Sequence, residues 1–161
     1  MRHVISVLVE NKFGVLAKIA GLFSARGYNI DSLAVGETED PRFSRMTVVV
    51  PGDDRIIDQV KRQLSKIIEV IDVKELVPGN YVERDLVLVK VPYIDSKKEK
   101  VDELIDRFHI TIADIVGDDV ILEIVGEEAF VESAIEELKQ IGIKEIVRTG
   151  TIALEKGCKE V

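Results

Sequence analysis

The stretch ENKFGVL, residues 10–16, joins an apolar run, Val4 to Val9, to an amphipathic run, Val15 to Arg26. A strand therefore delivers the chain to the start of a helix, where unpaired N–H groups and a positive macrodipole attract anions such as carboxylates. Gly14 lacks a Cβ, so a ligand can approach the backbone there, and the Asn11 amide can both donate and accept hydrogen bonds. A simple turn, with Asn11 as the N-cap residue, is the alternative interpretation of the same stretch.

The residues that follow predict the order strand, helix, strand, strand, helix, strand. The first helix has an expected apolar stripe of Leu16, Ile19, Ala20 and Phe23, and Gly27 is expected to end it in a left-handed conformation. This order is that of the ferredoxin-like, split βαβ fold. Strands are expected at residues 4–9, 28–36, 45–50 and 70–76, and helices at residues 15–26 and from Asp53 or Asp54 onward.

The same order recurs after Pro78-Gly79-Asn80, which reads as a linker. The fold class is therefore expected to be α+β, with two tandem ferredoxin-like βαββαβ domains at residues 1–77 and 83–161, joined by residues 78–82. Residues 150–161 form a weakly specified tail of the second domain. That domain has Pro92-Tyr93 after its first strand where the first domain has its glycine loop, so the Gly14 site is not repeated.

Composition limits the classes of function. Residues 1–80 carry 11 Lys and Arg and 11 Asp and Glu, whereas residues 81–161 carry 11 and 19, and an acidic half is a poor match for nucleic acid. No apolar run approaches the roughly 18 residues of a membrane span, and the N-terminus lacks a signal-peptide cleavage site. The single cysteine, Cys158, excludes a disulfide within the chain. These features predict a cytoplasmic protein that does not bind membranes.

No residues have the spacing of a catalytic set or a metal site, so no catalytic residue, metal ligand or cofactor is expected in this chain. The only histidines, His3 and His109, are interpreted as structural or solvated, and Cys158 has no histidine near it in the sequence. An acylphosphatase-like enzyme would need an arginine in the loop that contains Lys12. An RNA-binding domain of this topology would need aromatic residues on its central strands.

The segment NKFGVL, residues 11–16, within this topology resembles the ACT domain, an amino-acid-sensing module. Further blocks resemble the regulatory (small) subunit of acetolactate synthase, also called acetohydroxyacid synthase. The likeness covers about residues 1–157. These blocks are FSARGYNIDSL at 23–33, SRMT at 44–47, VERDLVLVK at 82–90 and RTG at 148–150.

The resemblance implies a non-catalytic subunit that activates a catalytic (large) subunit and conveys feedback inhibition by a branched-chain amino acid, usually valine. Thiamine diphosphate, Mg and FAD are then expected on the catalytic partner. The resemblance also implies a homodimer through the ACT domain, with the effector between the two copies. A stand-alone ACT module that senses an amino acid for a different client is the alternative. Carried over by position, the loop of one chain is Asn11, Gly14, Val15 and Leu16, and the neighbouring chain contributes Asn29 and Ile30.

Overall fold

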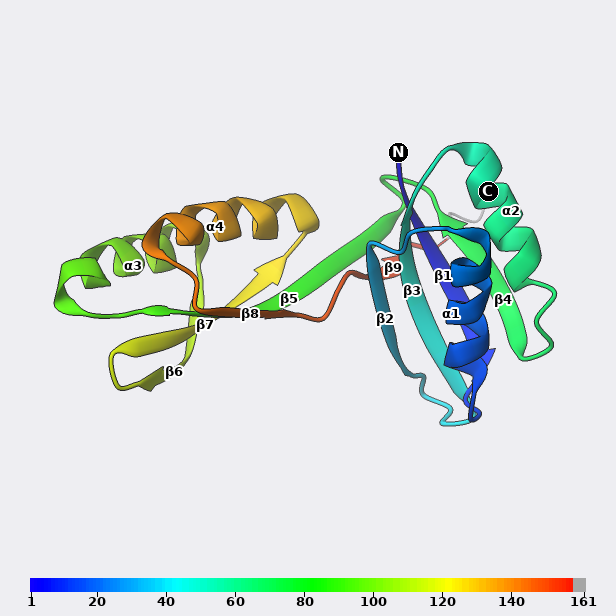
Figure 1. Ribbon diagram of the computed structural model, residues 1–161, viewed down its shortest axis with the longest axis horizontal. Coiled ribbons are helices and arrows are strands. Elements are labelled where there is room, and N and C mark those ends of the chain that lie inside the picture. The colour runs from blue at the N-terminus through cyan, green and yellow to red at the C-terminus, as the bar shows by residue number, and fades with distance from the viewer. Residues whose placement is uncertain (158–161) are drawn as a thin grey trace. The chain divides into compact units, whose positions relative to one another are not determined.

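The computed structural model describes residues 1–157, which form two compact units (Figure 1). The first unit comprises Met1–Val82 and the segment that begins at Thr151, and the second comprises Glu83–Gly150. Each unit has an antiparallel sheet with two helices on one face. The expected α+β class with two βαββαβ-like units is therefore confirmed. Cys158 lies outside the described residues.

The first unit has a four-stranded sheet of order β2-β3-β1-β4, with α1 and α2 on one face (Figure 1). The strands alternate between this face and the other, so Ile5, Val7 and Val9 of β1 point into a core beneath the helices. The elements are β1 (Arg2–Glu10), α1 (Val15–Arg26), β2 (Ser32–Glu37), β3 (Phe43–Pro51), α2 (Asp54–Leu64) and β4 (Val70–Leu76).

Helix α1 has the expected bounds but a different buried stripe. Val15, Ile19 and Phe23 are buried, whereas Leu16 is 43% exposed and Ala20 is also exposed. The three buried positions are four residues apart and form one row along the helix, beside which the half-buried Leu22 packs against the same core. The expected stripe assigned two residues beside this row to the core, and that assignment was wrong.

The strand expected at residues 28–36 begins only at Ser32. Gly27 ends α1 in the left-handed region at φ 66°, as the sequence predicted, and its N–H bonds to the last turn of the helix. The Tyr28 N–H also donates to the Phe23 carbonyl at 3.1 Å. Because the helix cap uses these residues, Asn29 and Ile30 lie in the connection between α1 and β2, outside the strand.

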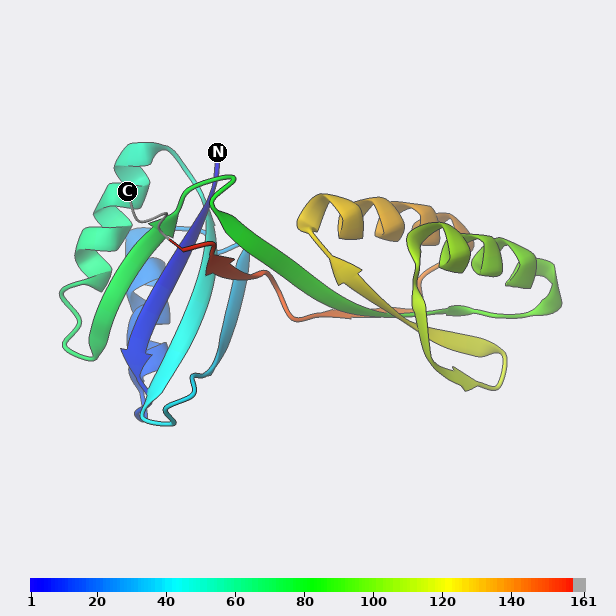
Figure 2. The same cartoon turned by 180° about the vertical axis from the view of Figure 1, so that it is seen from behind.

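The C-terminal segment corrects the expected boundary of the second domain. Residues expected to form a tail of that domain contain a strand, β9 (Ile152–Glu155), that belongs to the first unit. Ala153 packs with Val4, Val49 and Leu76. In Figure 2 the red strand near the C-terminus lies on the sheet face opposite the helices. Alternation along β1 and β3 leaves these aliphatic side chains on that second face, so they need a cover, which the short β9 provides.

Substitution of Ala153 by Asp tests this cover. Ala153 is 9% exposed, so the change places a carboxylate against three buried aliphatic side chains. We expect the free energy of unfolding to fall by about 2–3 kcal/mol, the usual cost of burying a polar group without a partner. The matched control is Leu154→Asp, because Leu154 is 69% exposed; it should cost less than about 0.5 kcal/mol. Urea unfolding followed by circular dichroism measures both. Equal stability of the two variants would contradict the role of β9.

The expected linker at residues 78–82 is shorter in the structure. Residues 77–80 form a turn in which the Asn80 N–H donates to the Val77 carbonyl at 2.9 Å and Gly79 has φ 86°. Strand β5 (Tyr81–Pro92) then begins at once, and the boundary between the units falls within this strand. The two residues after the turn are therefore part of a strand.

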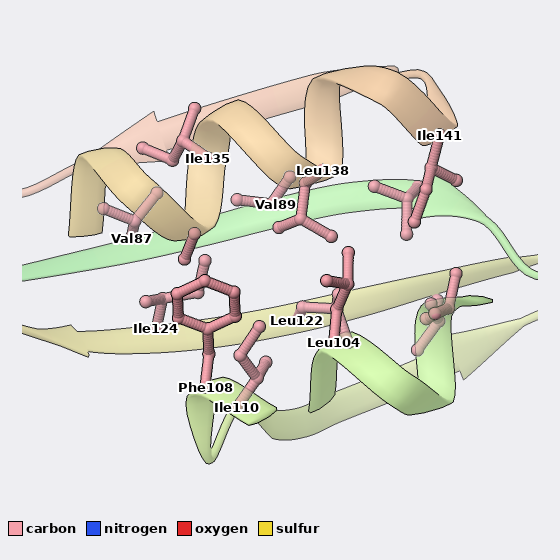
Figure 3. Packing of buried hydrophobic residues seen from close by; sticks show 14 of the residues in the cluster. Val87, Val89, Leu104, Phe108, Ile110, Leu122, Ile124, Ile135, Leu138 and Ile141 are labelled. Carbon is pink, nitrogen blue, oxygen red and sulfur yellow. The ribbon is translucent and has the colours of Figure 1, made fainter. Parts of the chain in front are cut away.

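The second unit repeats the sheet-and-helix pattern with strand order β6-β7-β5-β8. Figure 3 shows Leu104 and Phe108 of α3 and Leu138 and Ile141 of α4 pointing toward one another and toward the strands that run between the two helices in this view. Val87 and Val89 of β5 and Leu122 and Ile124 of β7 complete this core. The elements are α3 (Asp95–Phe108), β6 (Thr111–Val116), β7 (Asp119–Gly126), α4 (Glu128–Ile141) and β8 (Glu145–Arg148).

Candidate functional site

The loop between β1 and α1 is held on both sides by backbone hydrogen bonds. The Glu10 N–H donates to the Glu69 carbonyl at 2.8 Å, and the Asn11 N–H donates to the Arg42 carbonyl at 2.7 Å. The loop thus lies between the connection preceding β4 and the connection preceding β3. A loop fixed in this way is a preformed platform at the N-terminus of α1.

Gly14 occupies the N-cap position of α1 with φ 83° and ψ −7°, a left-handed conformation that glycine adopts readily. A Cβ built at this position has no atom within 4 Å, so the space beside the glycine is open. No side chain caps the helix at this position. The Val15 N–H donates to the Lys12 carbonyl at 3.4 Å, so the N–H groups of the next residues in this first turn are the ones left for a small carboxylate.

The Asn11 side chain is oriented by two hydrogen bonds from its amide nitrogen. Nδ2 donates to Glu37 Oε1 at 3.0 Å and to the Pro41 carbonyl at 3.0 Å. Both amide hydrogens are thereby used, and among residues 1–157 no donor is bonded to Oδ1. The Asn11 carbonyl oxygen can therefore accept a hydrogen bond from an ammonium group.

Paired charges surround this loop. Lys12 Nζ lies 2.6 Å from Glu10 Oε2, and the hydrogen bond between them raises the pKa of the lysine. Lys18 donates to Glu69, and this bond lowers the pKa of that carboxyl group. These two pKa shifts favour the charged forms of Lys12 and Glu69. The N-terminus of a helix attracts a carboxylate, and nearby carboxylate side chains attract an ammonium group. Together they suit a zwitterion, which carries both groups close to each other.

The sequence-predicted site residues fall into two groups. Asn11, Gly14, Val15 and Leu16 meet at the N-terminus of α1, where Val15 is buried in the core and Leu16 is exposed. Asn29 and Ile30 lie beyond the C-terminus of the same helix, and Asn29 Nδ2 donates to Asp31 Oδ1 at 2.7 Å. A helix of 12 residues is about 18 Å long, so a single chain cannot bring both groups to one small ligand.

Two acidic residues near these groups were absent from the sequence prediction. Glu37 orients Asn11, and Asp31 bonds to Asn29. Glu37 lies 26 residues from Asn11 in the sequence, and only the pairing of β2 and β3 brings it to the loop. Asp31 is only two positions after Asn29, and this short spacing between two polar residues was the one feature of the sequence that could have indicated their hydrogen bond.

A second cluster joins two of the sequence blocks that carried the family resemblance. Asp85 of β5 is 1% exposed, and Arg148 of β8 donates to its Oδ2 from Nε at 3.0 Å and from Nη2. Arg148 also bonds to Glu132, and Thr149 Oγ1 lies 3.3 Å from Asp85 Oδ1. The VERD and RTG blocks therefore meet in space, and their role here is to hold the second unit together.

Residues 1–157 contain no group of three or more His, Cys, Asp or Glu side chains that could hold a metal ion. In the same part of the chain, no helix is long and apolar enough to cross a membrane. The Nδ1–H group of His3 donates to Oε1 of Glu75, on the neighbouring strand β4, at 2.8 Å.

Comparison with known proteins gives one consistent family. Residues 5–72 match the model described as "AHAS small subunit-like ACT domain", and residues 84–157 match "Small subunit of acetolactate synthase". A probable acetolactate synthase small subunit of Archaeoglobus fulgidus is 48% identical over 99% of this chain and 100% of its own length. The acetolactate synthase isozyme 3 small subunit of Escherichia coli K12 is 36% identical over 99% and 98%.

A solved structure agrees with these matches. The crystal structure of the acetolactate synthase small subunit from Thermotoga maritima superposes with a TM-score of 0.90 and 40% identity. The comparison covers 98% of this chain and 99% of that one. The likeness therefore extends over both units and includes the C-terminal segment that carries β9.

Proposed function

The chain belongs to the family of acetolactate synthase small subunits, and we propose that it activates the catalytic large subunit and makes it sensitive to a branched-chain amino acid. Valine is the expected effector. Membership of this family implies a large-subunit partner, and it favours this function over an ACT module that serves a different client. Thiamine diphosphate, Mg and FAD are expected on the large subunit.

The geometry of the Gly14 loop is the observation that supports effector binding. The open space at Gly14 admits the α-carboxylate to the N-terminus of α1, and Asn11 Oδ1 is available to the α-ammonium group. Leu16 is an exposed aliphatic side chain on the first turn of that helix, so it can contact an isopropyl group. The loop thus offers a partner to each part of a branched-chain amino acid.

A second copy of the chain is needed to complete this site. Asn29 and Ile30 belong to the opposite end of α1 and can reach the effector only from the neighbouring chain. Strand β2 is at the edge of its sheet, and Val35 on it is 48% exposed, so this edge can pair with a second copy. In a two-fold dimer each of two equivalent sites takes its loop from one chain and Asn29 from the other.

Activity with the purified large subunit tests the proposal directly. The chain alone should produce no acetolactate, because its sequence has no residues with the spacing of a catalytic set. Its addition should raise the rate of the large subunit, and valine should then lower that rate. Titration calorimetry with valine, leucine and isoleucine identifies the effector. Turnover by the isolated chain, or activation without any response to these three amino acids, would contradict the proposal.

Mixing two defective chains tests whether the site is shared between copies. In a homodimer, Gly14→Asp disables the Gly14 loop in both effector sites, and Asn29→Ala removes the Asn29 side chain from both effector sites. Equal amounts of the two variants, unfolded and refolded together, should form mixed dimers in which one site has both defects and the other has none. Random pairing then restores about a quarter of the valine sites, measured by calorimetry. No recovery in the mixture would show that one chain supplies all the binding residues.

A further inference from the structure

Glu37 is the last residue of β2, and the register of the sheet decides where its side chain points. Glu37 pairs with Ser44 of β3, and Ser44 pairs with Val9 of β1. Directly paired residues of an antiparallel sheet point to the same face. Val9 belongs to the core beneath the helices, so Glu37 rises from the face on which α1 lies. Figure 1 shows the loop before α1 and the β2–β3 connection at the same end of this sheet.

Only one oxygen of the Glu37 carboxylate has a partner in the chain. Oε1 accepts a hydrogen bond from Asn11 Nδ2 at 3.0 Å, whereas no donor is bonded to Oε2 within residues 1–157. Asn11 Oδ1 is also without a donor, as described above. An ammonium group has three N–H donors, so it can bond to an oxygen on each of these two neighbouring side chains.

The cations around Glu37 are bound to other groups. Arg42 Nε lies 3.0 Å from both carboxylate oxygens of Asp40, and the lysines near the loop pair with other acidic residues, as described above. Glu37 has no ion-pair partner in the described part of the chain. Residues 37–42 contain three acidic residues and one basic residue. This end of the sheet therefore keeps an excess of negative charge beside the effector loop.

The two ends of the site have opposite polarity. The N-terminus of α1 carries a partial positive charge and attracts a carboxylate. The Glu37 carboxylate attracts a cation. An α-amino acid carries both groups on one carbon atom and suits both ends. An α-keto acid has the carboxylate but no cation, so Glu37 repels it and the second end of the site gains nothing from it.

We propose that Glu37 is the counter-ion of the effector's ammonium group, and that it makes the site selective for α-amino acids over α-keto acids with the same side chain. The proposal rests on the effector loop proposed above and adds to it a binding residue and a basis for selectivity. The α-keto analogue of valine keeps the carboxylate and the isopropyl group. Shape alone therefore discriminates poorly against it, whereas a charge beside the α-carbon discriminates well.

Glu37→Gln separates this role from the orientation of Asn11. Glutamine has nearly the same shape, and its Oε1 can still accept the hydrogen bond from Asn11 Nδ2, so the variant loses the charge and keeps the contact. Glu39→Gln is the matched control. Glu39 is also an exposed acidic residue of this connection, and among residues 1–157 its side chain has no hydrogen bond to Asn11. Circular dichroism checks that both variants are folded.

Titration calorimetry on the full-length chain compares valine with its α-keto analogue, which is measured by displacement of valine where it binds weakly. Glu37→Gln should bind valine about three- to tenfold more weakly than the parent chain, because a charge-assisted contact at an exposed site becomes a neutral one. Its affinity for the α-keto analogue should not fall. Added salt should weaken valine binding more in the parent than in Glu37→Gln, and Glu39→Gln should match the parent.

Three results would overturn the proposal. Equal affinity of the parent and Glu37→Gln for valine would show that the charge does not act on the ammonium group. Equal losses for valine and its α-keto analogue would show that Glu37 only orients Asn11. A parent chain that binds none of the three branched-chain amino acids would overturn this proposal together with the function proposed above. Valine binding that is lost in Gly14→Asp and unchanged in Glu37→Gln would overturn this proposal alone.

Discussion

Replacement of Arg148 by Met is expected to destabilise the second unit by about 2–4 kcal/mol. Asp85 is 1% exposed, and without the guanidinium the remaining side-chain partner of its carboxylate among residues 1–157 is the Thr149 hydroxyl. Loss of one partner from a buried ion pair costs about 3–5 kcal/mol in general. The lower range applies here because the Arg148 side chain is 36% exposed and water can reach part of the site.

Hydrogen exchange locates the effect, because β5 and β8 are joined by this pair. Amides of both strands should exchange faster in Arg148→Met, while those of β1 and β3 should keep the protection of the parent chain. Arg84→Met is the matched control. Arg84 is 49% exposed and its nearest ion-pair partner, Glu127, is 4.0 Å away, so that change should cost less than about 0.5 kcal/mol.

The double variant Asp85→Val with Arg148→Met separates the ion pair from simple packing. Removal of both charges leaves no buried carboxylate, so most of the lost stability should return. The coupling between the two sites, obtained from the double-mutant cycle, should exceed about 1 kcal/mol. Additive losses in the two single variants would show that Asp85 and Arg148 act independently.

The sequence predicted most elements of the first unit, because its apolar periods are strong and Gly27 is a typical residue for a helix C-terminus. Helix α1 matches residue for residue, and Gly27 ends it as expected. The errors have a common physical cause. The sequence pattern of a segment does not say what that segment packs against. Packing decides whether Leu16 and Ala20 are buried, where β2 begins and which unit contains β9.

The C-terminal segment illustrates this limit. Thr151 to Glu155 is too short and too mixed to be distinguished from a tail by pattern alone. Its place in the first unit follows from a sheet face whose aliphatic residues need a cover, and from hydrogen bonds such as that of the Thr151 N–H to Ser32 Oγ at 2.8 Å. That bond joins residues 119 positions apart, so no window of the sequence could show it.

The left-handed turn at Gly14 was predictable for a different reason, and the role of its loop in binding stays a prediction. A glycine after a strand and before a helix has few structural explanations, and the conformation of Gly14 at φ 83° agrees with a backbone that must be left-handed. The partners that orient the polar groups were not predictable. Glu37 reaches Asn11 only because β2 pairs with β3. The free acceptor, Asn11 Oδ1, could therefore be identified only from the structure.

Gly14→Asp is expected to weaken valine binding by about 30- to 1,000-fold, equivalent to about 2–4 kcal/mol. The new carboxylate would stand near the α-carboxylate of the effector at the N-terminus of α1. Two like charges about 4 Å apart repel by roughly 4 kcal/mol at an effective dielectric of 20, and the exposure of the loop lessens this. Feedback coupling is typically about 1–3 kcal/mol, and an empty site transmits none of it. The holoenzyme should therefore remain active and cease to respond to valine.

The fold should tolerate this substitution, because a Cβ at Gly14 meets no atom within 4 Å and Asp adopts left-handed backbone more readily than most residues. Gly14→Asn is the matched control, since it adds the same volume and the same backbone strain without the charge. We expect Asn to weaken valine binding by about tenfold and Asp by much more, as measured by calorimetry on folded protein. Equal losses would mean that space alone matters at Gly14. Undiminished binding by both variants would show that the loop is only a turn, and the effector would then have to bind elsewhere.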